Sequence, residues 1–253
     1  MFPLALVIIG LLVVALAFPA VNFRFLLYPI FPNLNPMRNA KRVSLEGPTM
    51  FISDLHLTAD SPFPYARNIR ELLDARDVSN LVIVGDLFDS PEDARKIMSG
   101  EPNLAISNIL GYGGLPVQVF FVQGSPPHDP NPSEVDVFNG TNVVRLGTCA
   151  ILDFGRVTVV VYHGHDLSFK GALGHGWDRF ISNLSLERAW KRLTGVPDSD
   201  WVIFGHTHIP GIDEKHRVAN CGGWQTVRCL VQPARTGIFL QPEDSYLEIV
   251  SLG

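Results

Sequence analysis

Several residue types are scarce in this 253-residue chain, and each scarcity argues against a class of protein. The three cysteines are odd in number and have no CxxC spacing, so the sequence indicates neither a disulfide framework nor a thiolate zinc site, and it fits a reducing compartment. There is no excess of basic residues, because the net charge is −5. Nucleic acid is therefore disfavoured as a partner. Histidine is also scarce, with eight residues, but five of them fall in the motifs described below.

Charge is absent from the amino-terminal 21 residues, and residues 1–22 form an apolar run. About 20 apolar residues are enough to cross a bilayer as a helix. The first charged side chain is Arg24, and Arg38, Lys41 and Arg42 follow before any acidic residue. The positive-inside rule therefore predicts a transmembrane anchor over residues 1–22, with the rest of the chain in the cytoplasm.

Two other interpretations of the apolar run stay open. Ala15-Leu16-Ala17 resembles a cleavage site, so a signal peptide with export is one alternative, although no basic residue precedes the run. A buried helix or hairpin is the other. Residues 25–31 are apolar again, and we expect them either in the membrane interface or packed on the domain. Residues 23–45 are predicted to be a linker because they are rich in Pro, Asn, Arg and Lys, and residues 46–253 to be the folded domain.

Five short runs rich in β-branched and aromatic residues follow, and each stops at polar side chains. Continuous apolar runs of this length are typical of strands buried on both faces. Helical patterns separate the first three runs, which predicts parallel pairing and places the carboxyl ends of the strands along one edge. The runs and the polar residues after them are 49–52 with Asp54 and His56, 81–84 with Asp86 and Asp89, 117–122 with His128 and Asp129, 157–162 with His163, and 201–204 with His206 and His208.

Imidazole and carboxylate groups gathered at one edge indicate a metal site. Each motif is weak alone: a single Asp-x-His or His-x-His is more often polar surface, and a lone Asp89 or Asp129 is more often a turn residue or a helix cap. All the motifs occur in one order, however, and each follows a predicted buried strand. Together they favour a functional metal site.

The blocks resemble those of the calcineurin-like metallophosphoesterases over about residues 49–250: D-x-H, G-D-x-x-D, G-N-H-D/E, H and G-H-x-H. The resemblance implies an α/β fold, a four-layer α/β/β/α sandwich of two mixed sheets. It also implies two divalent metal ions that share one bridging carboxylate. The first ion would be held by Asp54, His56, Asp86 and His208, and the second by Asp86, His163 and His206.

The third block departs from the family pattern. Where the family has adjacent Asn and His, this chain has Gly124-Ser-Pro-Pro-His128. The Asn ligand of the second ion is therefore missing, and either Ser125 or Pro127 stands in its place. The resemblance implies that His128 protonates the leaving oxygen and that Asp129 orients it. Asp89 is expected to support the loop rather than to bind metal.

The ligand set indicates the chemistry. Two cations about 3.5–4 Å apart, bridged by a carboxylate and a hydroxide, can hydrolyse a phosphodiester. Mixed imidazole and carboxylate ligands suit manganese, iron, zinc or cobalt, and Mn²⁺ is our first expectation. The blocks F-I-S-D-L-H-L and G-D-L-F-D are most similar to those of UDP-2,3-diacylglucosamine hydrolases, which cut a pyrophosphate bond in a lipid-linked nucleotide sugar.

Three functions stay open at this stage. The first is a membrane-anchored hydrolase of phosphodiester or pyrophosphate bonds in a lipid-linked or nucleotide substrate. The second is a nuclease of the same fold, and the third is a non-catalytic metal-binding scaffold with a degenerate second site. Only 43 positions separate His163 from His206, which leaves little room for a helical cap. The amphipathic stretch 177–193 between them is predicted to be a helix packed on the sheet, or otherwise a short lid or membrane-facing helix.

Overall fold

The structure of the chain is a computed structural model, and it describes residues 21–61, 63–98, 106–130, 143–168, 176–177, 179, 183–224 and 234–251. The predicted span over residues 1–22 lies outside this part except for its last two residues. Within the described ranges, no helix is long and apolar enough to cross a bilayer. The membrane anchor therefore stays a prediction.

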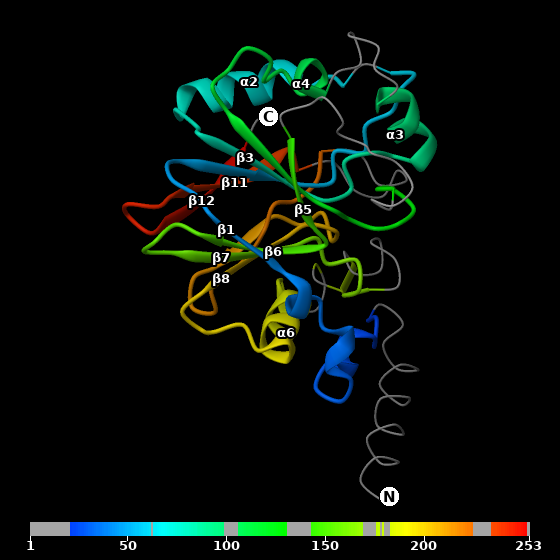
Figure 1. Ribbon diagram of the computed structural model, residues 1–253, viewed down its shortest axis with the longest axis vertical. Coiled ribbons are helices and arrows are strands. Elements are labelled where there is room, and N and C mark those ends of the chain that lie inside the picture. The colour runs from blue at the N-terminus through cyan, green and yellow to red at the C-terminus, as the bar shows by residue number, and fades with distance from the viewer. Residues whose placement is uncertain are drawn as a thin grey trace, which may run out of the picture.

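The strands of the described part form two six-stranded mixed sheets that face each other (Figure 1). In spatial order, the first sheet contains β12 (Tyr246–Ser251), β11 (Thr236–Gln241), β2 (Thr49–Ile52), β3 (Asn80–Val84), β4 (Gln118–Val122) and β5 (Val143–Gly147). The second sheet contains β1 (Lys41–Ser44), β6 (Cys149–Asp153), β7 (Thr158–Tyr162), β8 (Trp201–Phe204), β10 (Val218–Asn220) and β9 (Gly211–Asp213).

Parallel pairing dominates the part of each sheet that carries the polar motifs. Strands β2, β3, β4 and β5 are parallel neighbours in the first sheet, and β7, β8 and β10 are parallel neighbours in the second. The carboxyl ends of parallel neighbours lie at the same edge, so the loops after β2, β3 and β4 start side by side, as do those after β7 and β8. The parallel pairing predicted from the sequence is thus confirmed.

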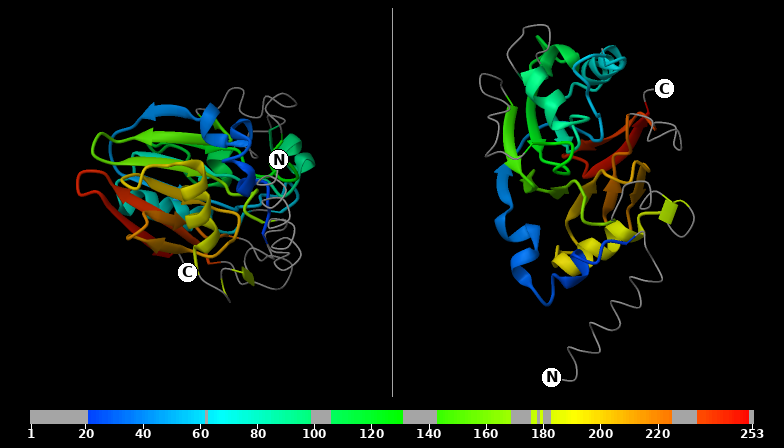
Figure 2. Two further views of the ribbon diagram at one scale, coloured as in Figure 1. Left: turned by 90° about the horizontal axis from the view of Figure 1, so that it is seen from below. Right: turned by 90° about the vertical axis from the view of Figure 1, so that its right-hand side faces the viewer.

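Helices cover the outer faces of the sandwich (Figures 1 and 2). Helices α2 (Ala66–Ala75), α3 (Pro91–Met98) and α4 (Ile106–Ile109) lie over the first sheet, and α6 (Ser185–Thr194) lies under the second. Alternate residues of a strand point to opposite faces, which explains the continuous apolar runs. In β3, Leu81 and Ile83 pack in the core beneath the helices, whereas Val82 and Val84 pack in the core between the sheets.

Helix α6 packs on the second sheet, as predicted for this part of the stretch 177–193. Its buried face includes Leu186 and Trp190, and the indole ring of Trp190 stacks on the ring of Tyr162 with centroids 4.7 Å apart. The ring of Phe204 meets the same indole edge-on at 5.2 Å. Residues 178 and 180–182 lie outside the described part.

The segment after residue 22 differs from the predicted linker. Residues 41–44 form β1, which pairs in parallel with β6, and three short 3₁₀ helices precede it: η1 (Phe25–Leu27), η2 (Pro32–Leu34) and η3 (Pro36–Asn39). Phe25 and Tyr28 are buried in the core around α6, while Ile30 and Phe31 are exposed. The prolines prevent a long helix, but one 3₁₀ turn is enough to bury two aromatic rings. The linker prediction for residues 23–45 is therefore corrected.

Candidate metal centre

The six predicted metal ligands come together from both sheets. In the first sheet, Asp54 and His56 follow β2 and Asp86 follows β3. In the second sheet, His163 follows β7, and β8 is followed by His206 and His208. They form two groups of three, and the ligand atoms within each group lie within 4.8 Å of one another. The first group is Asp54, His56 and His208, and the second is Asp86, His163 and His206. At this distance Asp86 belongs to the second group alone, so its predicted bridging position is not shown.

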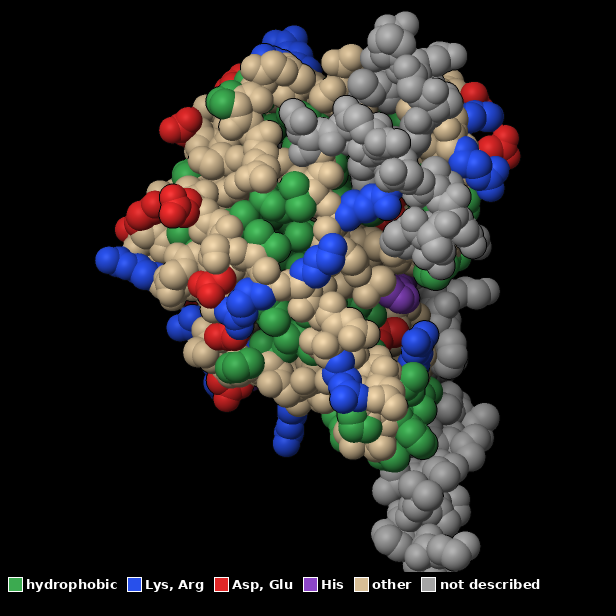
Figure 3. Space-filling view, viewed as in Figure 1, with side chains coloured by type: hydrophobic (Ala, Val, Ile, Leu, Met, Phe, Trp, Pro, Cys, Tyr) green, Lys and Arg blue, Asp and Glu red, His purple; other side chains and the backbone are tan. Residues whose placement is uncertain are grey.

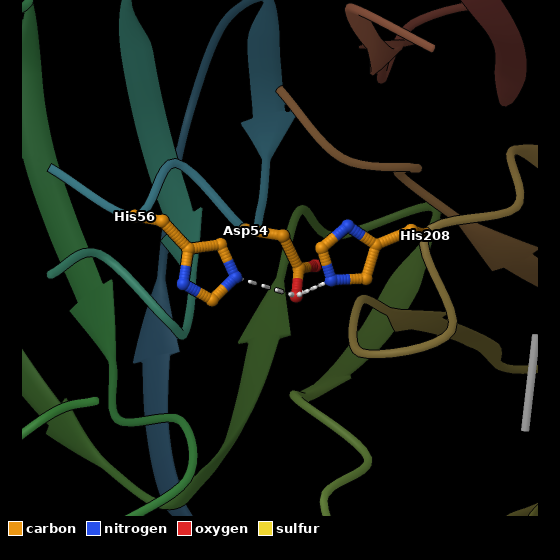
Figure 4. A group of neighbouring side chains, drawn as sticks. All are labelled: Asp54, His56 and His208. Carbon is orange, nitrogen blue, oxygen red and sulfur yellow. Dashed lines mark ion pairs between the residues drawn. The ribbon is translucent and has the colours of Figure 1, made fainter. Parts of the chain in front are cut away.

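Asp54 lies at the centre of the first group (Figure 4). Its carboxylate is fully buried, and its Oδ1 atom lies 3.2 Å from Nε2 of His208 and 4.0 Å from Nε2 of His56. The Oδ2 atom accepts hydrogen bonds from the backbone N–H of His206, at 2.9 Å, and from the hydroxyl of Ser53. Oδ1 has no hydrogen-bond partner. One oxygen is therefore fixed by the protein, while the other faces the two imidazoles.

The imidazole of His163 faces a carboxylate in the second group. Its Nδ1 atom lies 2.8 Å from the carbonyl oxygen of Val84, which can only accept, so Nδ1 carries the proton. Nε2 then faces Oδ2 of Asp86 at 3.1 Å. A neutral Nε2 and a carboxylate oxygen at this distance repel each other unless a proton or a metal ion lies between them. Burial lowers the pKa of His163, but the carboxylates of Asp86 and Asp54 outweigh it and raise the pKa to about 10.

The remaining charges also fit a divalent cation. Burial lowers the pKa of His206 to about 3 and that of His56 to about 4, so both are neutral imidazoles, the form that binds metal. Burial raises the pKa of Asp54, but the imidazoles of His208 and His163 outweigh it and hold the pKa below its usual range. Oδ1 of Asp54 and Nε2 of His163 are buried without hydrogen-bond partners. An unsatisfied buried polar atom costs about 1–3 kcal/mol, which a bound cation would relieve.

The backbone is strained where the ligands leave their strands. A positive φ is uncommon for residues other than glycine and costs about 1–2 kcal/mol. Among the described residues, ten non-glycine residues have a positive φ, and five of them are predicted ligands. These five are Asp54, His56, Asp86, His206 and His208. Such strain is typical of functional sites.

Two glycines let the chain approach the second group closely. A Cβ atom at Gly85, whose φ is +77°, would lie 2.6 Å from the ring of His163. A Cβ atom at Gly124 would lie 2.3 Å from both the backbone nitrogen and Oδ1 of Asp86. Both distances are shorter than a van der Waals contact. The glycines in the second and third blocks are therefore required by packing around the candidate ligands.

In the third block, Ser125 is the residue that reaches the second group. Its backbone N–H and its hydroxyl both donate to Oδ1 of Asp86, each at 2.7 Å. The chain then turns, because the N–H groups of His128 and Asp129 both donate to the carbonyl oxygen of Ser125, at 2.9 Å. Pro127 is exposed. Of the two residues that could replace the missing Asn, Ser125 is thus the one that contacts a candidate ligand.

Asp129 does not orient His128, and this prediction is corrected. The carboxylate of Asp129 is fully buried and accepts the backbone N–H groups of Gly124, Asp86 and Leu87, at 2.6, 2.8 and 2.9 Å. Burial, together with the charge of Asp86, raises its pKa to about 7. Adjacent residues in this tight turn point in different directions, so Asp129 points inward. It ties the loop after β3 to the loop after β4.

The backbone of Asp89 orients His128 instead. Nδ1 of His128 lies 2.7 Å from the carbonyl oxygen of Asp89, and its ring meets the ring of His56 edge-on, with centroids 4.5 Å apart. The N–H of Asp89 donates to the carbonyl oxygen of Leu57 at 3.0 Å, which connects its loop to the loop after β2. The carboxylate of Asp89 lies 3.7 Å from Nδ1 of His56. His56, Asp89 and His128 thus form a third group of possible ligand atoms.

A buried polar network beneath the His206–His208 loop was not anticipated in full. The side-chain amide of Asn220 donates to the carbonyl oxygen of Gly205 at 2.7 Å, to the hydroxyl of Thr207 at 3.1 Å and to Glu187 at 3.0 Å. Neither Asn220 nor Glu187 belongs to the sequence blocks described above. An acidic residue one turn before Trp190 on the apolar face of α6 was the available signal. The network holds the loop that carries two predicted ligands.

A family model and several solved structures are similar to this chain. The family model of the calcineurin-like phosphoesterase superfamily domain matches residues 49–240. No match was found among curated proteins. Three similar solved structures are an archaeal phosphodiesterase, the phosphoesterase Yfce from E. coli, and Vps29 from Entamoeba histolytica complexed with Zn²⁺.

The sequence similarity to these structures is low. The archaeal phosphodiesterase is 15% identical with a TM-score of 0.45, over 80% of this chain and 98% of that one. Yfce is 15% identical with a TM-score of 0.43, over 81% and 100%. Vps29 is 16% identical with a TM-score of 0.44, over 81% and 99%. The family model, in contrast, covers well over half of the chain and includes all six predicted ligands, so the chain belongs to the calcineurin-like phosphoesterase superfamily.

Proposed function

We propose that the chain hydrolyses phosphodiester or pyrophosphate bonds with two divalent metal ions. Members of this superfamily normally bind divalent metals, and the family supports a metal-dependent phosphoester hydrolase. One observation carries the two-ion proposal: the strand ends of both sheets bring two groups of three ligand atoms together, with a buried carboxylate in each group. Bound ions would polarise the phosphoryl group and activate water.

Within this proposal the side chains have separate roles. Asp54, His56 and His208 would hold the first ion. His163, His206 and Asp86 would hold the second, and Asp86 would also be shared with the first. Ser125 fixes Oδ1 of Asp86 with two hydrogen bonds of 2.7 Å, which leaves Oδ2 directed at His163. Mixed imidazole and carboxylate ligands suit Mn²⁺, our first choice, as well as iron, zinc or cobalt.

His128 is the proposed proton donor for the leaving oxygen. Its Nδ1–H donates to the carbonyl oxygen of Asp89, which fixes the ring and leaves Nε2 as the atom that carries the proton to be transferred. The side chain is only partly buried, unlike the fully buried Asp129 beside it. Asp129 keeps a supporting role in this scheme, because its carboxylate is used by backbone N–H groups.

We further propose a membrane-anchored protein that acts on a lipid-linked substrate. The apolar run 1–22 supports an anchor, with the domain on the cytoplasmic side. Ile30 and Phe31 expose 36% and 53% of their surface in the segment that follows the run. Figure 3 shows apolar side chains gathered at the lower end of the molecule, where Figure 1 draws this segment in blue. The two motif blocks similar to those of UDP-2,3-diacylglucosamine hydrolases support a pyrophosphate bond as the target.

Two experiments separate the alternatives. Turnover of bis-p-nitrophenyl phosphate by the full chain with Mn²⁺, and no turnover by the Asp86→Ala variant, would exclude the non-catalytic scaffold that the missing Asn suggests. A panel of UDP-diacylglucosamine, CDP-alcohols, cyclic nucleotides and single-stranded DNA would then define the substrate. We expect the pyrophosphate-containing lipid nucleotide to have the highest kcat/KM. A preference for DNA would overturn this proposal in favour of a nuclease.

A further inference from the structure

Ser168 contacts a candidate ligand of the second metal ion. Its hydroxyl oxygen lies 3.2 Å from Nε2 of His206, and both side chains are buried. The backbone N–H of His206 donates to Asp54 at 2.9 Å. The main chain of His206 is thus held by the first group, and its ring is held by Ser168. None of the sequence blocks includes Ser168, which comes five residues after His163.

This hydroxyl engages Nε2 of His206, so Nδ1 is the nitrogen left for a metal ion. A neutral imidazole has one N–H donor and one lone pair, on different nitrogens. If Nε2–H donates to the oxygen of Ser168, the lone pair lies on Nδ1 and is available to an ion. Ligating histidines usually donate their other N–H to an acceptor, which fixes the ring and its tautomer. Ser168 offers that acceptor.

Ser168 is in turn held by Val21 and Asn22, the last two residues of the apolar run. Val21 forms an antiparallel β-bridge with Ser168, and the backbone N–H of Asn22 donates to the carbonyl oxygen of Leu167 at 3.0 Å. Val21 and Leu167 are both buried. Phe25, three residues after Asn22, is buried in the core around α6. This burial anchors the chain next to the residues that contact Leu167 and Ser168. Residues 21 and 22 therefore act as a strap on the segment that contains Leu167 and Ser168.

We propose that Ser168 is a positioning residue for the second metal ion, and that residues 21–22 hold it in place as a strap. This inference rests on the two-ion site of the proposed function. It makes the affinity of the second ion depend on a segment more than 140 residues away in sequence from His163 and His206. If residues 1–20 cross the bilayer, the strap also fixes the metal centre close to the membrane surface, because the strap starts at residue 21.

The first test measures metal binding to the full chain with Mn²⁺ alone. Ser168→Ala should weaken binding of the second ion by about 10–100-fold and leave that of the first unchanged. Ser168→Thr keeps the hydroxyl and should restore the affinity. Electron paramagnetic resonance separates the two sites, because a Mn²⁺ pair gives an exchange-coupled signal and a single ion does not. Ser185→Ala is the matched control, since it removes a hydroxyl that accepts the indole N–H of Trp177 at 2.9 Å.

The second test addresses the strap. Asn22→Pro removes the N–H that binds Leu167, whereas Asn22→Ala keeps it. The proline variant should weaken the second ion and the alanine variant should not. Equal affinity in both would overturn the strap, and a Ser168→Ala variant that binds the second ion within about twofold of the wild type would overturn the role of Ser168. A wild-type chain that binds a single ion would overturn the proposed function itself, which is a distinct result.

Discussion

Nε2 of His163 lies 3.1 Å from Oδ2 of Asp86, and both side chains are buried just after the ends of β7 and β3. The carbonyl oxygen of Val84 holds the proton of this imidazole on Nδ1, so only a proton or a metal ion can occupy the space between the other nitrogen and the carboxylate. Without metal, the pKa of His163 is about 10, so a proton occupies this space at neutral pH. Metal binding and proton release are therefore linked at this pair.

Binding of the second ion should accordingly release a proton at pH 7–8. The pKa of His163 is raised in the metal-free protein, so this histidine is protonated throughout that range and must lose its proton to bind metal. The apparent affinity should rise about tenfold per pH unit until the pH approaches that pKa. Titration calorimetry in buffers with different ionisation enthalpies measures the proton count. A His163→Gln variant, which has no such proton, is the control, and equal proton release in both proteins would contradict this reading.

Replacing His128 should reveal its role through the leaving group. We expect His128→Ala to slow hydrolysis of a diester with a poor leaving group by about 10²–10⁴-fold. Hydrolysis of a p-nitrophenyl ester should hardly change, because p-nitrophenolate leaves without a proton. Metal content should stay normal. Equal slowing of both substrates with loss of metal would instead make His128 a ligand, as its proximity to His56 and Asp89 allows.

Ser125 should limit the affinity of the second site. Replacing Ser125-Pro126-Pro127 by a single Asn restores the family pattern and should tighten the second ion, because it supplies an amide oxygen. Ser125→Ala removes one of the two hydrogen bonds to Oδ1 of Asp86 and keeps the one from the backbone. This variant should lose about 1.5–3 kcal/mol of stability, a typical contribution of a hydrogen bond to a charged group. Calorimetry with Mn²⁺ and thermal unfolding give the two quantities, and weaker Mn²⁺ binding in the Asn variant would refute the idea.

The segment 23–45 should behave as part of the core. Phe25→Ala should lower the free energy of unfolding by about 3–5 kcal/mol, because it leaves a cavity under α6. Phe31→Ala is the matched control: this ring is 53% exposed, and its loss should change stability by about 0.5 kcal/mol or less. Urea denaturation of both variants makes the comparison. Equal stabilities would restore the linker interpretation.

Much of the centre could be predicted from the sequence, since buried parallel strands appear as continuous apolar runs and their ends share an edge. Asp54, Asp86 and His206 could be placed together on that basis alone. The hydrogen-bond partners of Asp129 and Ser168 could not be predicted in this way. They depend on the directions of side chains in a tight turn and in a loop held by residues 21–22. Phe25 and Tyr28 were missed for a related reason. Pro29 and Pro32 interrupt any periodic pattern in this segment. Only the packing around α6 shows that the two rings are buried.

The metal content of the Asp86→Ala variant tests the central claim most directly. The wild-type chain, loaded with Mn²⁺ and desalted, should contain two ions per chain by elemental analysis. Asp86→Ala removes the proposed bridge and the carboxylate that faces His163, so it should bind at most one ion weakly and lose hydrolysis by at least about 10²-fold. His208→Ala, matched to it, should lose mainly the first ion. Normal metal content in the Asp86→Ala variant would contradict the two-ion account.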